Sequence, residues 1–386
     1  MSDARSNEGT DNRAPADIKR GSAVRAPGDY ADRERVERTS ALRRITSHNL
    51  FGPVLALLLL LAACQVMSPG FLSISLQDGH LFGQLIDILR AAVTPMLLGL
   101  GMCLVIATAG IDLSVGAVMA ISLAVSLTFL DNANDAAAPG TVVTAIGLGL
   151  AVGLAVGVFN GFLVSVLDIQ PFIATMILMV AGRGIAMLIT RAQITTVTSA
   201  PFKSIGSGFT LGLPTPVVIG ALVFILLVLF VRKTALGMLV ESIGINAEAS
   251  RISGVQSRRI MWLVYILCGL LAGLAGLIYG APTMAADANN IGLMKEMDAI
   301  LCVVIGGTKM SGGKFYLGGT VVGALVLTTI ERAVIIFHIP ATATPLFKAI
   351  VVIVVVVAQA PQFRDWAQRH KRVGGAVEDS VREVAA

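Results

Sequence analysis

The chain has 386 residues, of which 55% are hydrophobic and only 14% are charged, with a mean hydropathy of +0.81 and a formal net charge of +5. Soluble domains carry about 25% charged residues, so this composition excludes an ordinary soluble enzyme. The positive balance does not indicate nucleic-acid binding, because residues 1–49 mix ten basic with eight acidic side chains.

Two polar tails flank an apolar body. Of the 29 basic and 24 acidic side chains, residues 1–49 hold 18 and residues 361–386 hold nine. The first tail is poor in apolar residues and contains Pro15 and Pro27, so we expect it to be disordered. Its length argues against a cleavable signal peptide, because the first apolar run begins only near Leu50. We interpret that run as a membrane helix and both tails as cytoplasmic.

The body, residues 50–360, contains apolar runs close to the roughly 20 residues that a helix needs to cross a bilayer. These runs lack the alternating polarity of a transmembrane β-barrel. We therefore predict an all-α, polytopic membrane protein. Its ten expected spans are 50–67, 86–108, 113–130, 141–167, 172–190, 216–231, 260–279, 298–307, 317–337 and 345–358. The eighth is either a short helix extended by the polar residues before it or a re-entrant hairpin.

Basic residues orient these spans, because short cytoplasmic loops are enriched in Lys and Arg. Such residues precede the first span, crowd the loop at 232–259 and follow the eighth and tenth spans. All four positions are cytoplasmic if ten crossings exist and both termini lie inside, although Arg191 and Lys203 depart from this pattern. The residues concerned are Arg43, Arg44, Arg232, Lys233, Arg251, Arg258, Arg259, Lys309, Lys314, Arg364, Arg369, Lys371 and Arg372.

Glycines recur at every fourth position on several spans, and small residues let membrane helices pack closely. These faces either pack within one subunit or form an interface between subunits. The four cysteines lie in apolar runs without metal-ligand spacing, so we expect small buried side chains. The glycines are the series Gly149, Gly153, Gly157 and Gly161, the two pairs Gly269 with Gly273 and Gly276 with Gly280, and the pair Gly319 with Gly323; the cysteines are Cys64, Cys103, Cys268 and Cys302.

The sequence offers no catalytic or cofactor motif. GGTKMSGGKF resembles a phosphate-binding loop, but Thr308 replaces its first glycine and Phe315 its final Ser or Thr, so it fails the motif. The four histidines are scattered near ends and loops. We expect no enzyme activity, and no metal or cofactor, on this chain.

Ionisable residues inside membrane spans are pointers to a transport path. Asp112 is either a helix cap or a path residue, and Asp298 has the same two alternatives. Arg183 either snorkels outward or faces the path, while Glu331 and Lys348 could pair. A carrier driven by protons or ions would more often show several carboxylates in mid-span, so the energy for transport is expected from elsewhere.

The loop at 232–259 predicts a short helix at 247–252 that ends at Gly254. This helix either docks on a cytoplasmic partner or lies on the lipid surface. Its sequence, INAEASRISGV, resembles the coupling segment of sugar importer permeases that work with ATP-binding-cassette (ABC) ATPases.

Four blocks in order resemble the signature of that family, of the ribose, xylose and galactofuranose type: ATAGIDLSVGAVMAI, IQPFIATMILMVAGRGIA, TALGMLVESIGINAEASRISGV and MDAILCVVIGGTKMSGGKFYLGG. The likeness covers residues 50–360. LQDGHLFGQLIDILRAA and AADANN look closest to the galactofuranose members. The long charged N-terminal tail is extra to the family pattern.

The resemblance implies a multi-pass permease of the bacterial inner membrane that imports a monosaccharide, a pentose or a hexose, by alternating access. The implied partners are an ABC ATPase that holds ATP and Mg, a periplasmic sugar-binding protein and a second permease subunit in a homo- or heterodimer. A secondary carrier or channel without an ATPase, and a membrane scaffold, are the alternatives. The implied coupling residues are Gly244, Asn246, Glu248, Ala249, Arg251 and Gly254, and the path or gate candidates are Asp112, Ser114, Gln170, Arg183, Asp298 and Thr308.

Overall fold

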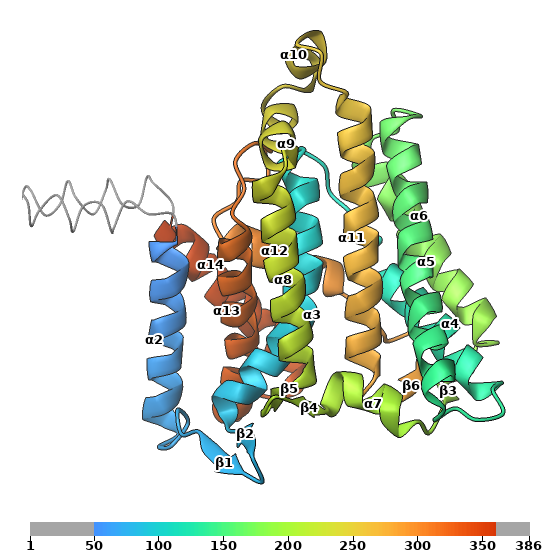
Figure 1. Ribbon diagram of the computed structural model, residues 1–386. Coiled ribbons are helices and arrows are strands. Elements are labelled where there is room, and N and C mark those ends of the chain that lie inside the picture. The colour runs from blue at the N-terminus through green and yellow to red at the C-terminus, as the bar shows by residue number, and fades with distance from the viewer. Residues whose placement is uncertain (1–49, 360–386) are drawn as a thin grey trace, which may run out of the picture. The chain divides into compact units, whose positions relative to one another are not determined.

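The computed structural model describes residues 50–359, which fall in one compact unit. The predicted tails and the basic residues in them lie outside the described residues. Helices dominate this unit (Figure 1), which confirms the all-α prediction. They are α2 (Phe51–Met67), α3 (Gln84–Ala107), α4 (Val115–Asp131), α5 (Pro139–Ser165), α6 (Pro171–Ile189), α7 (Ala200–Ser207), α8 (Thr215–Lys233), α9 (Leu236–Ile245), α10 (Ala247–Ile252), α11 (Ser257–Gly280), α12 (Lys295–Ile305), α13 (Leu317–Ile336) and α14 (Thr344–Gln359), with a 3-10 turn at Ala341–Ala343.

Short antiparallel strand pairs lie at one end of the helices, and α9 and α10 lie at the other end (Figure 1). Two pairs are hairpins, and the third joins the segment after α6 to the segment after α11. The pairs are β1 (Ser75–Gln77) with β2 (His80–Phe82), β4 (Phe209–Thr210) with β5 (Leu213–Pro214), and β3 (Thr195–Thr196) with β6 (Ala285–Ala286). Sequence reasoning missed these strands and α7.

Each of the ten expected spans coincides with a helix in the described part of the chain. Six helices there are long and apolar enough to cross a membrane, namely α3, α5, α6, α8, α11 and α13, while α2, α4, α9 and α14 are shorter apolar helices. The eighth expected span is α12, which begins at the polar residues Lys295 and Glu296. It is therefore the extended short helix rather than a hairpin. Its 11 residues reach about 16 Å, so ten full crossings stay a prediction.

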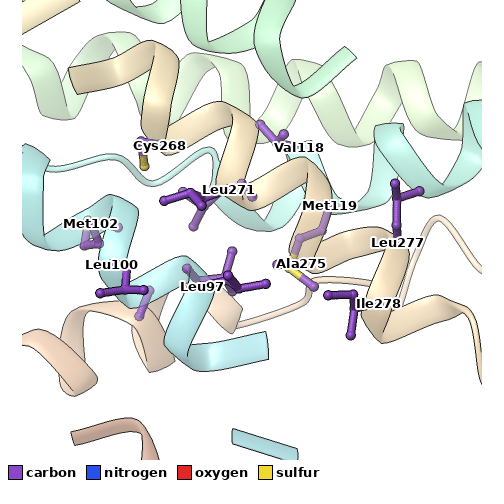
Figure 2. Packing of buried hydrophobic residues seen from close by; sticks show 14 of the residues in the cluster. Leu97, Leu100, Met102, Val118, Met119, Cys268, Leu271, Ala275, Leu277 and Ile278 are labelled. Atoms are coloured by element: carbon purple, nitrogen blue, oxygen red, sulfur yellow. The ribbon is translucent and has the colours of Figure 1, made fainter. Parts of the chain in front are cut away.

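Among the six long apolar helices α3 is the most deeply buried: 83% of its most apolar stretch lies inside the unit, against 22% for α6 and for α8. Figure 2 shows Leu97 of α3 facing Leu271 and Ala275 of α11. α3 is thus an interior helix, whereas α5, α6 and α8 present apolar side chains outward, as lipid-facing helices do. The four cysteines are buried and unpaired, as expected for small apolar side chains.

The predicted glycine face of α5 packs against α11 within this unit. A methyl group added at Gly153 would lie 2.6 Å from the carbonyl oxygen of Gly269, and one at Gly157 would lie 2.7 Å from that of Tyr265. At Gly273 the nearest backbone is again that of Gly153. Because the two backbones touch, these glycines serve packing within the subunit, and we call this contact the α5–α11 seam.

We predict that Gly153→Ala lowers the unfolding temperature in detergent, because the added methyl group forces the α5 and α11 backbones apart, an overpacking cost of about 1–3 kcal/mol. Gly147→Ala on the same helix is the matched control, since nothing lies within 4 Å of its added methyl group. Thermal unfolding followed by tryptophan fluorescence measures both. Equal midpoints for the two variants would contradict the seam.

Candidate functional site

The basic loop after α8 folds into two helices rather than the one expected. The helix predicted at 247–252 is α10, with those bounds, and Gly254 follows it with a φ of 87°. Sequence reasoning missed α9. Its buried side chains Leu236, Val240 and Ile243 recur at helical spacing, which is the signal that could have revealed it.

Hydrogen bonds at both ends hold α10 in shape. Asn246 Oδ1 accepts from the backbone N–H of Ala249 at 2.9 Å, and the Ser250 hydroxyl donates to the Asn246 carbonyl at 2.9 Å. After the helix, the Gly254 N–H donates to the Arg251 carbonyl at 3.0 Å. A six-residue helix is unstable alone, so these caps explain why α10 is formed before any partner is bound.

The outer face of α10 is exposed and mixed in character. Arg251 and Glu248 form an ion pair with nitrogen–oxygen distances of 2.5 and 2.9 Å, and this pair lowers the pKa of Glu248 and raises that of Arg251. Ile245 and Ile252 flank the pair and are 75% and 77% exposed. A charged pair between two exposed isoleucines is a surface that a protein partner could cover.

Behind this surface, α9 rests directly on the end of α3. A methyl group at Gly244 would collide with the carbonyl oxygen of Ala107 and the backbone nitrogen of Gly313. That nitrogen donates to the same Ala107 oxygen at 2.9 Å. At Gly312, with φ of 84°, an added methyl group would lie 2.8 Å from the Gly244 carbonyl and 2.9 Å from Ala109 Cβ. Three distant segments therefore meet here, and we call the contact the Gly244 junction.

From the junction the chain runs into residues 108–114, a non-helical segment between α3 and α4. Asp112 is 1% exposed, and its Oδ1 accepts from the backbone N–H of Ser114 at 2.9 Å and from the Ser114 hydroxyl at 2.6 Å. The Thr175 hydroxyl of α6 donates to the Ile111 carbonyl at 3.3 Å. Irregular backbone at membrane depth persists only where protein buries it or where it lines a cavity. We name residues 108–114 the interior segment.

Two residues that sequence reasoning missed complete the surroundings of Asp112. The Asn160 amide of α5 donates to the Ser114 hydroxyl at 2.7 Å, so a hydrogen-bonded chain runs from Asn160 through Ser114 to Asp112. Tyr265 of α11 lies near the same carboxylate. The sequence signal that could have revealed Asn160 is its position as a single amide side chain inside an apolar, glycine-rich helix.

Arg183 lies apart from Asp112. Its guanidinium nitrogen Nη1 donates to the carbonyls of Ala288, Asn289 and Ile291, at 3.1, 3.2 and 2.8 Å. This arginine of α6 thus holds the loop that leads into α12.

Asp298 belongs to a separate ionic network. It accepts from Lys295 and from Lys348, each at 2.9 Å, and Lys348 also pairs with Glu331 at 2.9 Å. The expected pairing of Glu331 with Lys348 is therefore confirmed, and Asp298 joins it. The network ties α12, α13 and α14 together.

The remaining path candidates lie apart from these groups. Gln170 is exposed at the start of α6. Thr308 is buried in the turn after α12, where its hydroxyl accepts from the Tyr316 N–H at 3.1 Å and lies 3.7 Å from the Cys103 sulfur. Of the six path or gate candidates, only Asp112 and Ser114 are brought together. A role for any of the six in a path stays a prediction.

The sequence matches the family model described as branched-chain amino acid transport system / permease component over residues 84–358. The chain belongs to this permease family. It is therefore a multi-pass membrane transport subunit, and permeases of ABC importers in general work with an ATPase and a binding protein. No solved structure matches the chain significantly.

Three similar curated proteins are sugar permeases. The galactofuranose transporter permease protein of Escherichia coli strain K12 is 46% identical over 84% of this chain and 94% of its own length. The fructose import permease protein of Bifidobacterium longum strain NCC 2705 is 42% identical over 92% of this chain and 100% of its own length. The ribose import permease protein of Escherichia coli strain K12 is 35% identical over 78% of this chain and 91% of its own length.

We predict that Lys348→Met destabilises the permease by about 3 kcal/mol, because Asp298 and Glu331 then lose their shared cation in a largely buried site. The double variant Lys348→Met with Glu331→Gln should recover part of that loss, since Glu331 has no other cation whereas Asp298 keeps Lys295. Thermal unfolding in detergent measures both, with Lys309→Met, at an exposed lysine, as control. A double variant no more stable than the single one would contradict the network.

Proposed function

We propose that this chain is the membrane-spanning permease subunit of an ABC importer and carries a monosaccharide into the cytoplasm by alternating access. The observation that carries the proposal is the Gly244 junction. It joins the exposed helix α10 to the interior segment. A partner bound to α10 on the cytoplasmic side therefore has a direct mechanical route to the interior of the permease. The sugar class follows from the galactofuranose, fructose and ribose permeases to which the chain is similar. A pentose or hexose fits all three, and galactofuranose is the first candidate.

ATP and Mg are proposed to bind on a separate ATPase subunit rather than on this chain. Three of the described carboxylates support this division, because Asp298 and Glu331 are held by lysines and Asp112 by Ser114, whereas the buried Glu296 keeps one oxygen, Oε2, without a partner. A secondary carrier driven by protons would more often place several free carboxylates in mid-span. The similar permeases also favour the importer over a carrier or channel working alone.

The ATPase is proposed to cover α10, with Asn246, Glu248, Ala249, Arg251 and Gly254 in or beside the contact and Gly244 behind it. In this orientation α10 faces the cytoplasm of a bacterium and the short strand pairs face the periplasm, where a sugar-binding protein would deliver its cargo. A second permease subunit, identical or different, would complete the path.

The proposed topology has ten crossings of the inner membrane and both termini in the cytoplasm. The Gly244 junction supports it, because the basic loop at 309–314 lies beside α9. The two basic loops that the positive-inside rule assigns to the cytoplasm therefore share one end of the described unit.

The first test is sugar uptake by proteoliposomes that contain the chain, its cognate ATPase and its binding protein. We expect uptake only when ATP and Mg are present on the side of the membrane that carries the ATPase. Charge reversal at Glu248 or Arg251 should lower uptake at least fivefold without shifting the unfolding temperature, because the ion pair is exposed. Uptake by this chain alone under a proton gradient would contradict the proposal.

The second test addresses the mechanical route. Gly244→Ala should leave α10 and ATPase binding intact yet lower ATP-driven uptake at least tenfold, because the methyl group displaces α9 from the end of α3. The matched control is Gly318→Ala in the first turn of α13, where nothing lies within 4 Å of the added group. Copurification with the ATPase and uptake are measured on the same samples. Full uptake by Gly244→Ala would show that the junction transmits nothing.

A further inference from the structure

The segment that leads into α12 is irregular, polar and exposed on the surface of the described unit. It comprises residues 287–294, with the sequence DANNIGLM, and lies between β6 and α12. Asn289 and Asn290 are exposed, and the following Leu293 and Met294 are 53% and 61% exposed. We call this segment the 287–294 loop.

Contacts with α4 and α6 show how deep the 287–294 loop lies. It starts where β6 pairs with β3, beyond the end of α6 (Figure 1). Five residues after its start, the carbonyl of Gly292 lies so close to Gly116 of α4 that a methyl group on Gly116 would collide with it. The next residue of α4, Ala117, lies 3.1 Å from a methyl group added at Gly182, near the middle of α6. The loop therefore runs from the end of α6 to the level of its middle.

Hydrogen bonds hold the 287–294 loop in one shape at this depth. Arg183 of α6 donates to three of its carbonyls, as described above. Asp287 Oδ1 accepts from the backbone N–H groups of Asn289 and Asn290 at 3.0 and 3.3 Å, and its Oδ2 accepts from the Asn290 amide nitrogen at 2.6 Å. Within residues 50–359, neither the Asn289 side chain nor the Asn290 amide oxygen takes part in a hydrogen bond. These exposed amide groups are therefore fixed in place and still free to bind.

The surroundings at this level are apolar. Val180 and Ile185, on either side of Arg183, are 67% and 43% exposed. Because α6 is long and apolar enough to cross a membrane, its middle lies at the depth of the hydrocarbon. Lipid cannot satisfy amide groups there, and irregular backbone persists at that depth only where protein buries it or where it lines a water-filled cavity. This subunit leaves the loop exposed, so we expect it to face a water-filled cavity that a second subunit closes.

The free groups on the 287–294 loop suit a polyhydroxylated ligand. An asparagine amide both donates and accepts hydrogen bonds, and so do the hydroxyl groups of a sugar. Leu293 and Met294 follow directly and are exposed, so apolar side chains are available for the C–H faces of a sugar ring.

We propose that Asn289 and Asn290 form a subsite for sugar hydroxyl groups in the wall of the transport path. This inference rests on the proposed function and gives it a binding site at membrane depth. The second permease subunit closes the path opposite the 287–294 loop, so the subsite needs no separation of helices that pack together within this subunit.

The first measurement asks whether water reaches the loop. Asn289→Cys in the complete transporter is treated with a small charged methanethiosulfonate, added to both sides of the membrane, without nucleotide, with ATP under non-hydrolysing conditions, and during turnover. We expect it to react in at least one state. The wild type gives the background, because its four cysteines are buried. Ile225→Cys in the middle of α8, at a position 53% exposed on an apolar helix, is the matched control and should stay unreactive in lipid.

The second measurement asks whether the amide contacts the sugar. Uptake is measured in proteoliposomes with D-galactose, D-fructose and D-ribose as probes, and with the monodeoxy analogues of whichever is imported. Asn289→Ala should import the parent sugar about threefold to tenfold more slowly, as expected for one lost hydrogen bond. It should also lose the discrimination that the wild type shows against one deoxy analogue. Asn134→Ala, at an exposed asparagine in the loop between α4 and α5, is the control and should behave as the wild type.

The two measurements separate the subsite from the importer function. Failure of Asn289→Cys to react in every state, or a reaction no faster than that of Ile225→Cys, would show that lipid or a dry contact covers the loop and would overturn the subsite. Unchanged discrimination in Asn289→Ala would overturn it too, whether uptake is slower or not, and would leave the importer function in place. If the wild-type transporter imports none of the probes with ATP, the proposed function fails and the sugar subsite fails with it.

Discussion

Where Gly153 and Gly157 of α5 meet Gly269 and Gly273 of α11, two helix backbones lie in contact with no side chain between them. Lipid gives apolar helices little reason to associate, so such close approach is a main source of packing energy in a membrane. The same device recurs at the Gly244 junction, where α9 touches the end of α3. Glycine contacts thus both hold the unit together and join its exposed end to its interior.

This way of packing decides where polar groups can lie. The α5–α11 seam buries Asn160 and Tyr265, and the interior segment brings Asp112 to them. Asp298, Lys348 and Glu331 form a separate ionic network, which fastens the last helices. One polar cluster is therefore fully paired, whereas the other retains unpaired atoms inside the packed unit.

The features that could be predicted from the sequence are those that depend on local signals. Long apolar runs predicted the helices, the spacing of four residues between glycines indicated the packing face of α5, and the helix-forming residues closed by Gly254 predicted α10. The convergence of Asp112, Asn160 and Tyr265 could not be predicted, because it depends on how helices far apart in the sequence cross. Arg183 was ambiguous for the same reason, since its partners are backbone carbonyls of a loop about a hundred residues away.

Cys268 provides the most direct test that nucleotide binding on the cytoplasmic side reaches the interior segment through the Gly244 junction. Its thiol is 1% exposed and lies beside Asp112. With the other three cysteines replaced by serine, its reaction rate with a small maleimide can be measured in the complete transporter without nucleotide, with ATP under non-hydrolysing conditions, and during turnover. We expect the thiol to be protected in one of these states and to react at least tenfold faster in another. Equal protection in all three states, in a complex that still imports sugar, would contradict the account.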